Sequence, residues 1–453
     1  MVIGNPPYLG GRDWKDEDGR NYNYFIDKYE VAEYQFDMYV IFWERGLNIL
    51  KKDGILGFIT PITWLNNQKT KKLRDFILSK TSIIELVDYS DINVFKDAVV
   101  LTMIGLIKNS IPSFDNIVKL TKPINEGEIT SFKSIQQKAW IDNELNIINT
   151  NLNNQDVGII SKLELIGMPL DNFSTVKFGI KLYETGKGKP PQNKEDAINQ
   201  IFEAFLKKGD DYRKYLEGKD INTYQTNYKD RWLKYGENLA APRTPDLFEG
   251  ERILVRRIVG ERLISTYIKD NFVTSQLLQI VKPNRGISAK LLLALLNSSL
   301  LAYYFRKKYN RIDKTFPEIR IYELRSLPII YESSNEQLFI EQVENMLLLN
   351  KTLLELSHKF QRALEREFAL DSLPKKLQDW YLLAFGDFIK ELEKKKAKLS
   401  LSQKAEWEDY FLQESKKALA LKTDIDNTDK EIDAMVYELY GLTKEEIEIV
   451  EKS

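Results

Sequence analysis

The sequence contains no cysteine and only one histidine, His358, among its 453 residues. Without cysteine the chain forms no disulfide and offers no thiolate to a nucleophilic mechanism or to a zinc site. With one imidazole it has little for a mechanism that relies on a His–Asp pair or on several histidine ligands. We therefore expect no metal site and a chemistry that needs neither residue. The lack of cysteine fits a reducing compartment such as the cytoplasm.

Neither a strong charge of one sign nor a long apolar run is present. The 66 basic and 67 acidic residues give a formal net charge of −1, so the chain lacks the overall basic character usual for nucleic-acid binders. Any phosphate contacts would come from local clusters of Lys and Arg. The most apolar long stretch, 289–305, is interrupted by Asn297, Ser298 and Ser299, which favours a buried helix over a membrane span. The first residues also lack the basic and apolar regions of a secretory signal.

Residues 1–112 have the texture of an α/β domain. Apolar residues recur at helical spacing over 36–50, and a short apolar strand over 55–60 follows Gly54. A further helix is expected over 67–80, with strands over 83–88 and 98–107. Alternating helices and buried strands predict a doubly wound, Rossmann-like sheet. The sequence holds only part of such a sheet, because turn residues begin at Gly4.

The remaining chain divides by composition into three parts. Residues 113–165 are polar and Asn-rich and are predicted to be a connector. Residues 166–330 mix short β-like segments with Gly, Pro, Tyr and Arg, and a mobile loop is expected over 185–197. Residues 331–453 are predicted to be a helical tail that includes His358 at its surface. Near-heptad apolar spacing there indicates a helical hairpin or an oligomer interface, and Thr443 with Glu446 predicts a capping box on a final helix.

Asn5-Pro6-Pro7-Tyr8, preceded by Gly4, is the most informative motif. The side-chain oxygen of Asn5 and the carbonyl of Pro6 could accept both N–H bonds of an exocyclic amine such as that of adenine, whose lone pair is delocalised into the ring. Two prolines hold the acceptors rigid, and Tyr8 offers a ring for stacking. Direct displacement from a sulfonium needs neither histidine nor cysteine. An ordinary turn is the alternative interpretation, since Asn-Pro and Pro-Pro are common turn dipeptides.

Gly4–Tyr8 resembles the catalytic motif of amino-methylating DNA methyltransferases. Residues 53–65 are similar to the next strand and loop of that family, and 94–107 to a later segment whose aromatic residue covers the other face of the target base. The resemblance implies catalytic roles for Asn5, Pro6, Pro7 and Tyr8, and S-adenosylmethionine as the methyl donor. It also implies that Tyr8 and Phe95 sandwich an adenine flipped out of the duplex. Without the motif, Phe95 would be interpreted as a core aromatic.

A second resemblance covers the middle of the chain. Phe178–Ile180, Thr185-Gly186, Tyr215–Ile221, Arg252–Ile258 and Leu295–Leu301 are similar, in that order, to segments of the TaqI-like specificity domain. Ser326–Pro328 lies where that domain usually ends. The segment 432–446 resembles the end of large enzymes that fuse methylase and specificity functions. The chain thus resembles the type IIG restriction–modification methyltransferases over nearly its whole length.

The sequence departs from this family in one respect. The Gly-rich loop and acidic residue that bind S-adenosylmethionine lie upstream of the motif in the family, and only four residues precede Asn5 here. Gly179, Gly186 and Gly188 have no strand–turn–helix context. We therefore expect an incomplete donor pocket, with an upstream segment or a separate polypeptide supplying the donor-binding or nuclease part.

The specificity-domain resemblance predicts double-stranded DNA as the partner. Arg252, Arg256 and Arg257 are candidate contacts, although adjacent strand residues point to opposite faces, so at most one of Arg256 and Arg257 faces the groove directly. Lys219 in a loop and Arg306 in a second basic cluster are further candidates. For that cluster a solvated charged face is the alternative.

These observations together predict site-specific adenine methylation of DNA within a restriction–modification or phage-defence system. A first alternative is a DNA-recognition fragment or subunit that is inactive without a partner carrying the donor domain. A second alternative is an RNA or protein-glutamine methyltransferase, because Asn-Pro-Pro-Tyr also occurs in those enzymes. The specificity-domain resemblance over 170–330 argues against the second alternative.

Overall fold

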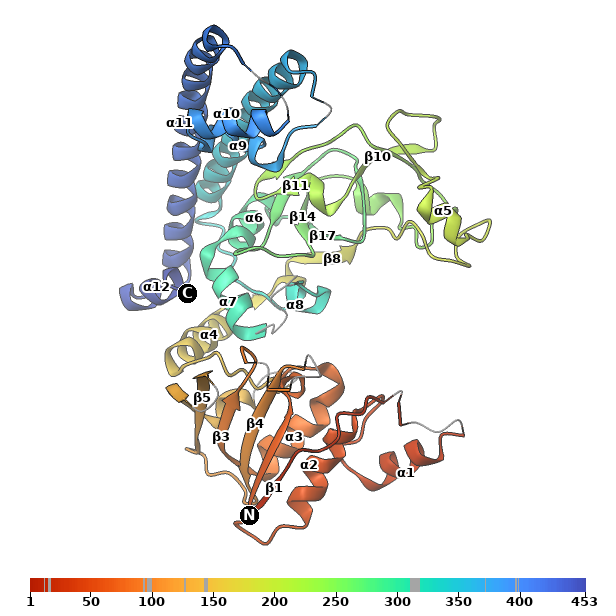
Figure 1. Cartoon of the computed structure of the whole chain (residues 1–453), viewed down its shortest axis with the longest axis vertical. Coiled ribbons are helices and arrows are strands. Elements are labelled where there is room, and N and C mark those ends of the chain that lie inside the picture. Colours follow the sequence, from red (N-terminus) through yellow and green to blue (C-terminus); the bar gives the residue numbers. More distant parts are fainter. Residues whose placement is uncertain are drawn as a thin grey trace. The chain divides into compact units, whose positions relative to one another are not determined.

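The computed structural model describes residues 1–11, 13–14, 18–92, 94–95, 100–125, 128–141, 146–309, 318–370, 372–395, 397 and 399–453 (Figure 1). The chain divides into two compact units. Unit 1 comprises Met1–Leu165 and Tyr304–Thr315, and unit 2 comprises Ile166–Tyr303 and Phe316–Ser453. The finer division at residues 112, 165 and 330 stays a prediction. Among the described residues, no helix has both the length and the apolar character that crossing a membrane requires.

Unit 1 is built on a mixed sheet whose described strands have the order β1-β2-β4-β3-β5-β6. The bounds are β1 Val2–Gly4, β2 Ile55–Pro61, β3 Ser82–Asp88, β4 Thr102–Lys108, β5 Ile117–Asn125 and β6 Glu128–Gln136. β1 runs parallel to β2, and β3 runs parallel to β5, whereas β4 is antiparallel to both of its neighbours. The expected α/β class is confirmed. The Rossmann-like topology stays a prediction. The described sheet is mixed, since the antiparallel strand β4 lies between β2 and β3.

The segment expected to be a connector instead extends this sheet. β5 and β6 form an antiparallel pair in which Val118, Leu120 and Ile135 are buried. Helix α4 (Asn154–Ile166) follows. The polar composition did not point to these strands, because the pairing of β5 with β3 and with β6 decides their conformation.

Tryptophan packing joins the helices of unit 1 to the sheet. Helices α2 (Met38–Asn48) and α3 (Lys71–Lys80) contact β2 and β3 respectively, and α1 (Arg20–Lys28) has no buried residue. Trp43 of α2 is fully buried, with its ring centroid 5.2 Å from Phe58 and 5.7 Å from Trp64. A Cβ on Gly105 would lie 2.9 Å from the Trp43 ring, so β4 needs glycine there to admit the indole.

Unit 2 contains two four-stranded sheets that share one hydrophobic core. The first has the order β15-β14-β17-β8 and is antiparallel throughout, and the second has the order β16-β10-β13-β9. Leu254 and Ile280 of the first sheet and Tyr215, Leu216 and Leu233 of the second belong to the shared core. The bounds are β8 Ser174–Phe178, β9 Glu203–Ala204, β10 Tyr212–Leu216, β13 Trp232–Lys234, β14 Arg252–Arg256, β15 Ser265–Ile268, β16 Val273–Thr274 and β17 Leu278–Pro283.

Smaller elements complete the strand-rich part of unit 2, and helix α7 begins in unit 2 and ends in unit 1, which includes Tyr304–Thr315. Two short antiparallel pairs, β11·β12 and β7·β18, lie outside the larger sheets. Helix α6 is almost entirely buried and packs against β15, and its N-cap Ser288 accepts a hydrogen bond from the Leu291 amide. The bounds are β7 Met168–Pro169, β11 Ile221–Asn222, β12 Gln225–Thr226, β18 Pro328–Ile329, α5 Lys194–Ile198, α6 Ala289–Asn297, α7 Ser299–Tyr309 and α8 Ile321–Arg325.

Two long helices form the tail of unit 2. α9 (Glu336–Glu367) packs against α11 (Leu401–Leu439), and α10 (Phe385–Lys394) also contacts α11 (Figure 1). The predicted apolar stripe of α9 is buried, and its Phe360 stacks on Trp380 with a centroid distance of 3.6 Å. The helical hairpin is therefore confirmed. α12 (Lys444–Glu451) begins with the predicted capping box between Thr443 and Glu446.

An ionic network around the buried Asp433 fastens α11 to the strand-rich part of unit 2. Arg262 contacts Asp429 at 3.0 Å and Asp433 at 2.9 Å. Asp433 also accepts hydrogen bonds of 2.8 Å from the amide and from the hydroxyl of Ser299. Because Asp433 is buried, losing these partners would leave an uncompensated charge inside the protein, which costs free energy of folding. The network therefore fixes the position of the tail within unit 2.

We expect Gly179→Ala to destabilise unit 2 by about 1–3 kcal/mol, the usual cost of overpacking. A Cβ at Gly179 would lie 2.2 Å from the Thr274 carbonyl oxygen and 2.3 Å from that of Ser275, and neither main chain can move without disturbing β16. Denaturant unfolding followed by circular dichroism measures the change. Gly386→Ala is the matched control, because a Cβ there meets nothing within 4 Å. Equal unfolding curves for the two variants would contradict the packing argument.

Candidate base-binding loop and nucleic-acid interface

The Asn5–Tyr8 motif lies at the carboxyl end of β1. β1 pairs in parallel with β2 through Val2–Leu56, Ile3–Gly57 and Gly4–Phe58, so the segments that follow both strands emerge at the same edge of the sheet. A Cβ on Gly4 would lie 3.0 Å from the Phe58 ring, and glycine therefore lets β1 approach β2 closely. The motif that the sequence singled out is thus placed by a backbone pairing with a strand about 50 residues away.

Asn5 is the most available polar group of this loop. Its side chain is exposed and has no hydrogen-bond partner among the described residues. Pro6 is buried and Pro7 is exposed, so the ring of Pro6 anchors the loop on the protein. An amide that is held by rigid neighbours and not engaged internally is free to accept a hydrogen bond from a ligand.

Tyr8 is fixed by one hydrogen bond and two ring contacts. Its hydroxyl donates to the Ile59 carbonyl of β2 at 3.1 Å, and burial raises the pKa of Tyr8 to about 12, so the phenol stays protonated at physiological pH. The Tyr8 ring contacts Phe95 edge-to-face, with centroids 6.1 Å apart and planes at 76°, and Tyr39 in the same way at 6.3 Å. The two rings predicted to sandwich a base are therefore neighbours. Parallel stacking of a base between them would require one ring to turn.

The turn that follows β2 is held by a buried arginine that the sequence analysis did not single out. Arg74 of α3 is fully buried and donates to the carbonyls of Trp64 at 2.8 Å and Asn67 at 2.7 Å. Burial lowers the pKa of Arg74 to about 10, which still leaves it charged at neutral pH. Because this turn shares an edge with Asn5–Tyr8, Arg74 makes that edge rigid.

Asp37 is a second residue that the sequence analysis missed. It immediately precedes α2, where the amide of Met38 donates to the carbonyl of Leu9 at 2.9 Å and brings the chain back to the motif. Burial raises the pKa of the Asp37 carboxyl, partly offset by a hydrogen bond from the Gly11 backbone. In the sequence Asp37 stands directly before an apolar helix. An ordinary N-cap residue has the same position, so this pattern did not single out Asp37 as a site residue.

The structure gives different roles to the three arginines predicted to contact DNA in β14 and directly after it. Arg252 is fully buried and donates to the carbonyls of Gly250, Asp270 and Phe272, so its predicted DNA contact is corrected to a packing role. Arg257 forms an ion pair with Glu318 at 2.8 Å. Arg256 is half-buried, and its guanidinium has no partner among the described residues. Of the three arginines, Arg256 is the one left free to bind a ligand.

The other predicted contacts lie on loops or helix ends. Lys219 is exposed and pairs with Glu217 at 2.9 Å. Arg306 is exposed in α7, whereas the adjacent Lys307 contacts Asp156 at 3.1 Å and Lys308 pairs with Glu164. The cluster therefore offers less free positive charge than its sequence suggests, and residues 310–317 at its end lie outside the described residues.

The loop expected to be mobile is tethered by a buried glutamine. Gln192 donates to the carbonyls of Leu182 at 2.9 Å and Asn238 at 2.7 Å, and accepts from the Glu184 amide at 2.8 Å. Gly188 has φ +83°, and a Cβ there would lie 2.4 Å from the Asn238 carbonyl oxygen. A polar composition indicated flexibility, but these main-chain contacts order the loop.

No cluster of potential metal ligands occurs among the described residues.

Family comparisons agree with this arrangement. The profile of the Eco57I restriction-modification methylase matches residues 1–95, and that of the TaqI-like C-terminal specificity domain matches residues 213–329. A third profile, Domain of unknown function (DUF8810), matches residues 332–436 in the helical tail. The solved structure of the type IIL restriction-modification enzyme MmeI in complex with DNA aligns with a TM-score of 0.48 and 12% identity, covering 92% of this chain and 57% of that one.

Two curated relatives are similar over stretches longer than any of the three family profiles. The type II restriction enzyme and methyltransferase RM.Eco57I of Escherichia coli is 26% identical over 170 residues, which is 37% of this chain and 17% of that protein. The putative type II restriction enzyme and methyltransferase RM.MjaORFECS2P of Methanocaldococcus jannaschii is 25% identical over 339 residues, which is 73% of this chain and 27% of that protein. The matched region thus spans only a minor part of either relative. The chain thus carries an Eco57I-like restriction-modification methylase region over residues 1–95 and a TaqI-like C-terminal specificity domain over residues 213–329, and this combination fits the type IIG group.

Proposed function

We propose that this chain provides the base-binding loop and the sequence-reading domain of a site-specific DNA adenine methyltransferase that uses S-adenosylmethionine. The observation that carries the proposal is the exposed, unpartnered side chain of Asn5 at the carboxyl edge of the β1–β2 pair, beside the rings of Tyr8 and Phe95. The Eco57I-like methylase match over residues 1–95 supports it, because this match includes all three residues.

The loop residues would act by orienting and activating the amine. Asn5 Oδ1 and the Pro6 carbonyl accept one N–H bond each, which directs the nitrogen lone pair out of the adenine plane. Preorganised acceptors of this kind stabilise the positive charge that develops on the amine in the transition state without any reorganisation. The proton of the product can leave to solvent, so the lack of a histidine or cysteine base costs the mechanism nothing.

The ring pair supports a flipped-out base. An adenine inside a duplex is stacked and paired, so its amine cannot reach Asn5 unless the nucleotide rotates out. In the present arrangement Phe95 meets Tyr8 edge-to-face, so the two rings are not parallel and do not yet form a stacking site for a base. An entering base would therefore replace the contact between Tyr8 and Phe95. One face of the base would stack on Tyr8 and the other on Phe95.

The methyl donor implied by the family supplies an electrophilic methyl group. The glycines considered for a donor loop do not fit that role. Gly179 lies against the carbonyls of Thr274 and Ser275, and Gly188 against that of Asn238, so both serve close main-chain packing in unit 2. Donor binding by this chain is therefore the first property to measure. Calorimetry with S-adenosylmethionine, without and with duplex DNA, measures it directly.

We expect Asn5→Ala to lower the rate of methyl transfer by about 10²–10³-fold, the usual effect of removing one preorganised hydrogen-bonding group. Tritium transfer from S-adenosylmethionine to duplex DNA measures the rate, in whatever assembly of the chain is active. DNA affinity should change little, because the Asn5 side chain meets only the flipped base. The control is Asn48→Ala at the exposed end of α2. A rate for Asn5→Ala equal to that of Asn48→Ala would remove Asn5 from the mechanism.

Substitutions at Tyr8 separate stacking from hydrogen bonding. Tyr8→Phe loses only the hydrogen bond to Ile59, worth about 0.5–1.5 kcal/mol of stability, and should keep base binding. Tyr8→Ala loses the ring as well and should abolish stable stacking. The fluorescence of 2-aminopurine at the target position reports unstacking from the duplex and restacking on the protein. Identical fluorescence in the two variants would show that the Tyr8 ring does not contact the base.

Arg256 is the proposed reading residue of the specificity domain. We expect Arg256→Ala to weaken specific DNA binding about tenfold or more at fixed salt, as for the loss of one bidentate base contact. Fluorescence anisotropy with target and scrambled duplexes measures the loss and its sequence dependence. Arg285→Ala removes an exposed arginine elsewhere in the same unit as the control. Equal losses in both variants would indicate a general charge effect and no base reading by Arg256.

A further inference from the structure

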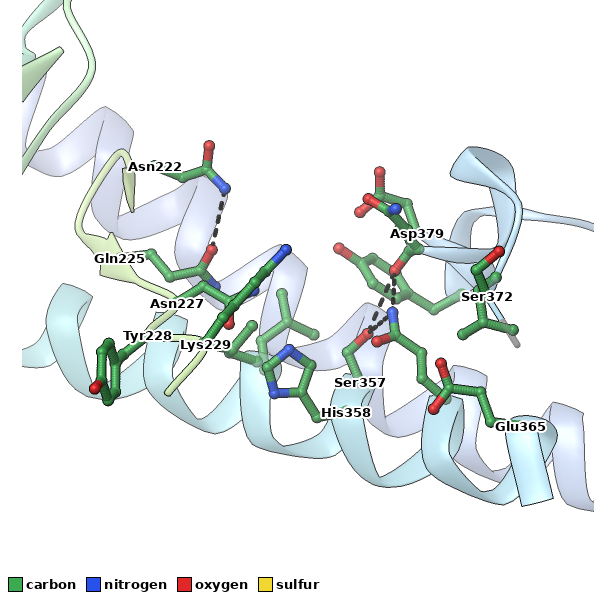
Figure 2. A pocket seen from close by; sticks show the side chains of 16 residues that line it. Asn222, Gln225, Asn227, Tyr228, Lys229, Ser357, His358, Glu365, Ser372 and Asp379 are labelled. Atoms are coloured by element: carbon green, nitrogen blue, oxygen red, sulfur yellow. Dashed lines mark hydrogen bonds between the residues drawn. The ribbon is translucent and has the colours of Figure 1, made fainter. Parts of the chain in front are cut away.

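A polar cavity of about 550 Å³ lies within unit 2 (Figure 2). One wall is the β11·β12 hairpin with the residues that follow it, and the other is α9 together with the segment after it. The volume falls within the roughly 300–1,000 Å³ of small-molecule sites, which are usually mainly apolar. Here amides, hydroxyls and ionisable groups dominate the lining, which favours a small polar ligand over an apolar one.

Several of these polar groups are unused. Asn227 and Lys229 face His358 of α9 across one end of the cavity (Figure 2). Within the described part of the chain none of these three side chains has a hydrogen-bond or ion-pair partner. Ser357 and Gln361, by contrast, both donate to the Gln378 carbonyl, at 3.4 Å and 2.9 Å. The floor of the cavity is therefore internally satisfied, while its end is open to a ligand.

The two ends of the cavity differ in charge. At one end Lys229 lies near His358, and burial, Arg362 and Lys229 together lower the pKa of the imidazole, with Glu365 opposing them. A positive field at this end favours an anionic group. The carboxylates of Glu365 and Asp379 lie toward the other end, together with Ser372, where they can accept hydrogen bonds from amino or hydroxyl groups (Figure 2).

We propose that this cavity binds one nucleotide, with its phosphate between Lys229 and His358 and its base or sugar toward the carboxylates of Glu365 and Asp379. Lysine binds phosphate as a point charge, and carboxylates accept hydrogen bonds from the amino groups of bases and the hydroxyl groups of sugars. The nucleotide is either free in solution or part of a DNA strand and outside the stack, because both present the same chemistry. The site does not involve Asn5, so it stands or falls independently of methyl transfer.

The single histidine makes the test direct. The full chain labelled with [13Cε1]histidine gives one imidazole signal, that of His358. Adenosine and thymidine 5′-monophosphates should shift this signal saturably and raise the pKa of His358, because the bound phosphate stabilises the protonated ring. Inorganic phosphate at equal concentration should give no saturable shift. A shift as large with phosphate alone would overturn the proposal, since the site would then bind an anion without reading a nucleoside.

A single-stranded oligonucleotide distinguishes the sources of the ligand. Saturable shifts with the monophosphates support binding of free nucleotides, and a shift with the oligonucleotide alone supports a nucleotide held within a DNA strand. No saturable shift with any of these probes overturns the proposal. Lys229→Met should weaken binding about tenfold, as for the loss of one charge-assisted contact. Lys351→Met is the matched control on α9, because Lys351 is exposed and lies outside the cavity.

Discussion

The three-residue pairing between β1 and β2 is the constraint on which the position of the Asn5–Tyr8 loop depends. Val2–Gly4 has no other paired strand among the described residues, so the positions of Asn5 and Tyr8 follow from the register with Leu56–Phe58. β2 is in turn braced by β4 along its whole length and by Trp43 from α2. The Tyr8–Ile59 hydrogen bond then ties the end of the motif to the same strand. A short strand can position a reactive loop here because its partner lies deep in a packed core.

Arginine has two separate uses in this chain. Some guanidinium groups bind main-chain or carboxylate groups inside the protein, and others have no internal partner in the described part of the chain and could bind a nucleic acid. Arg74 and Arg252 are fully buried and hold main-chain carbonyls, and Arg262 anchors the helical tail through Asp429 and Asp433. These side chains contribute to rigidity and present no charge to a nucleic acid. Arg256, at the end of a strand and without an internal partner among the described residues, is available for a phosphate or a base. Counting basic residues therefore overstates the DNA-binding surface.

The helical tail forms one wall of the polar cavity in unit 2. α11 is attached through Arg262 and Asp433, and α9 packs against α11 and meets the β11·β12 hairpin, where the Gln225 amide donates to the Asn350 carbonyl at 3.4 Å. The cavity lies between the hairpin and α9, and polar side chains make up most of its lining. A tail of this kind can therefore add a binding site to a specificity domain without altering the strands that would read DNA.

The sequence by itself determined the α/β character of unit 1, the buried stripe of α9 and the TaqI-like segments within residues 213–329, because each is a local pattern of neighbouring residues. The motif Asn5–Tyr8 is also a local pattern, and its catalytic role stays a prediction. Tertiary structure decided what depends on pairing between distant segments. It placed polar residues 117–136 in the sheet, inserted antiparallel β4 between β2 and β3, and tethered the lysine-rich loop through Gln192. In the folded chain Arg252 is buried, Arg256 has no internal partner among the described residues, and His358 lines a cavity. Burial and partnership of a polar side chain are set by segments far away in the chain, and no local pattern encodes them.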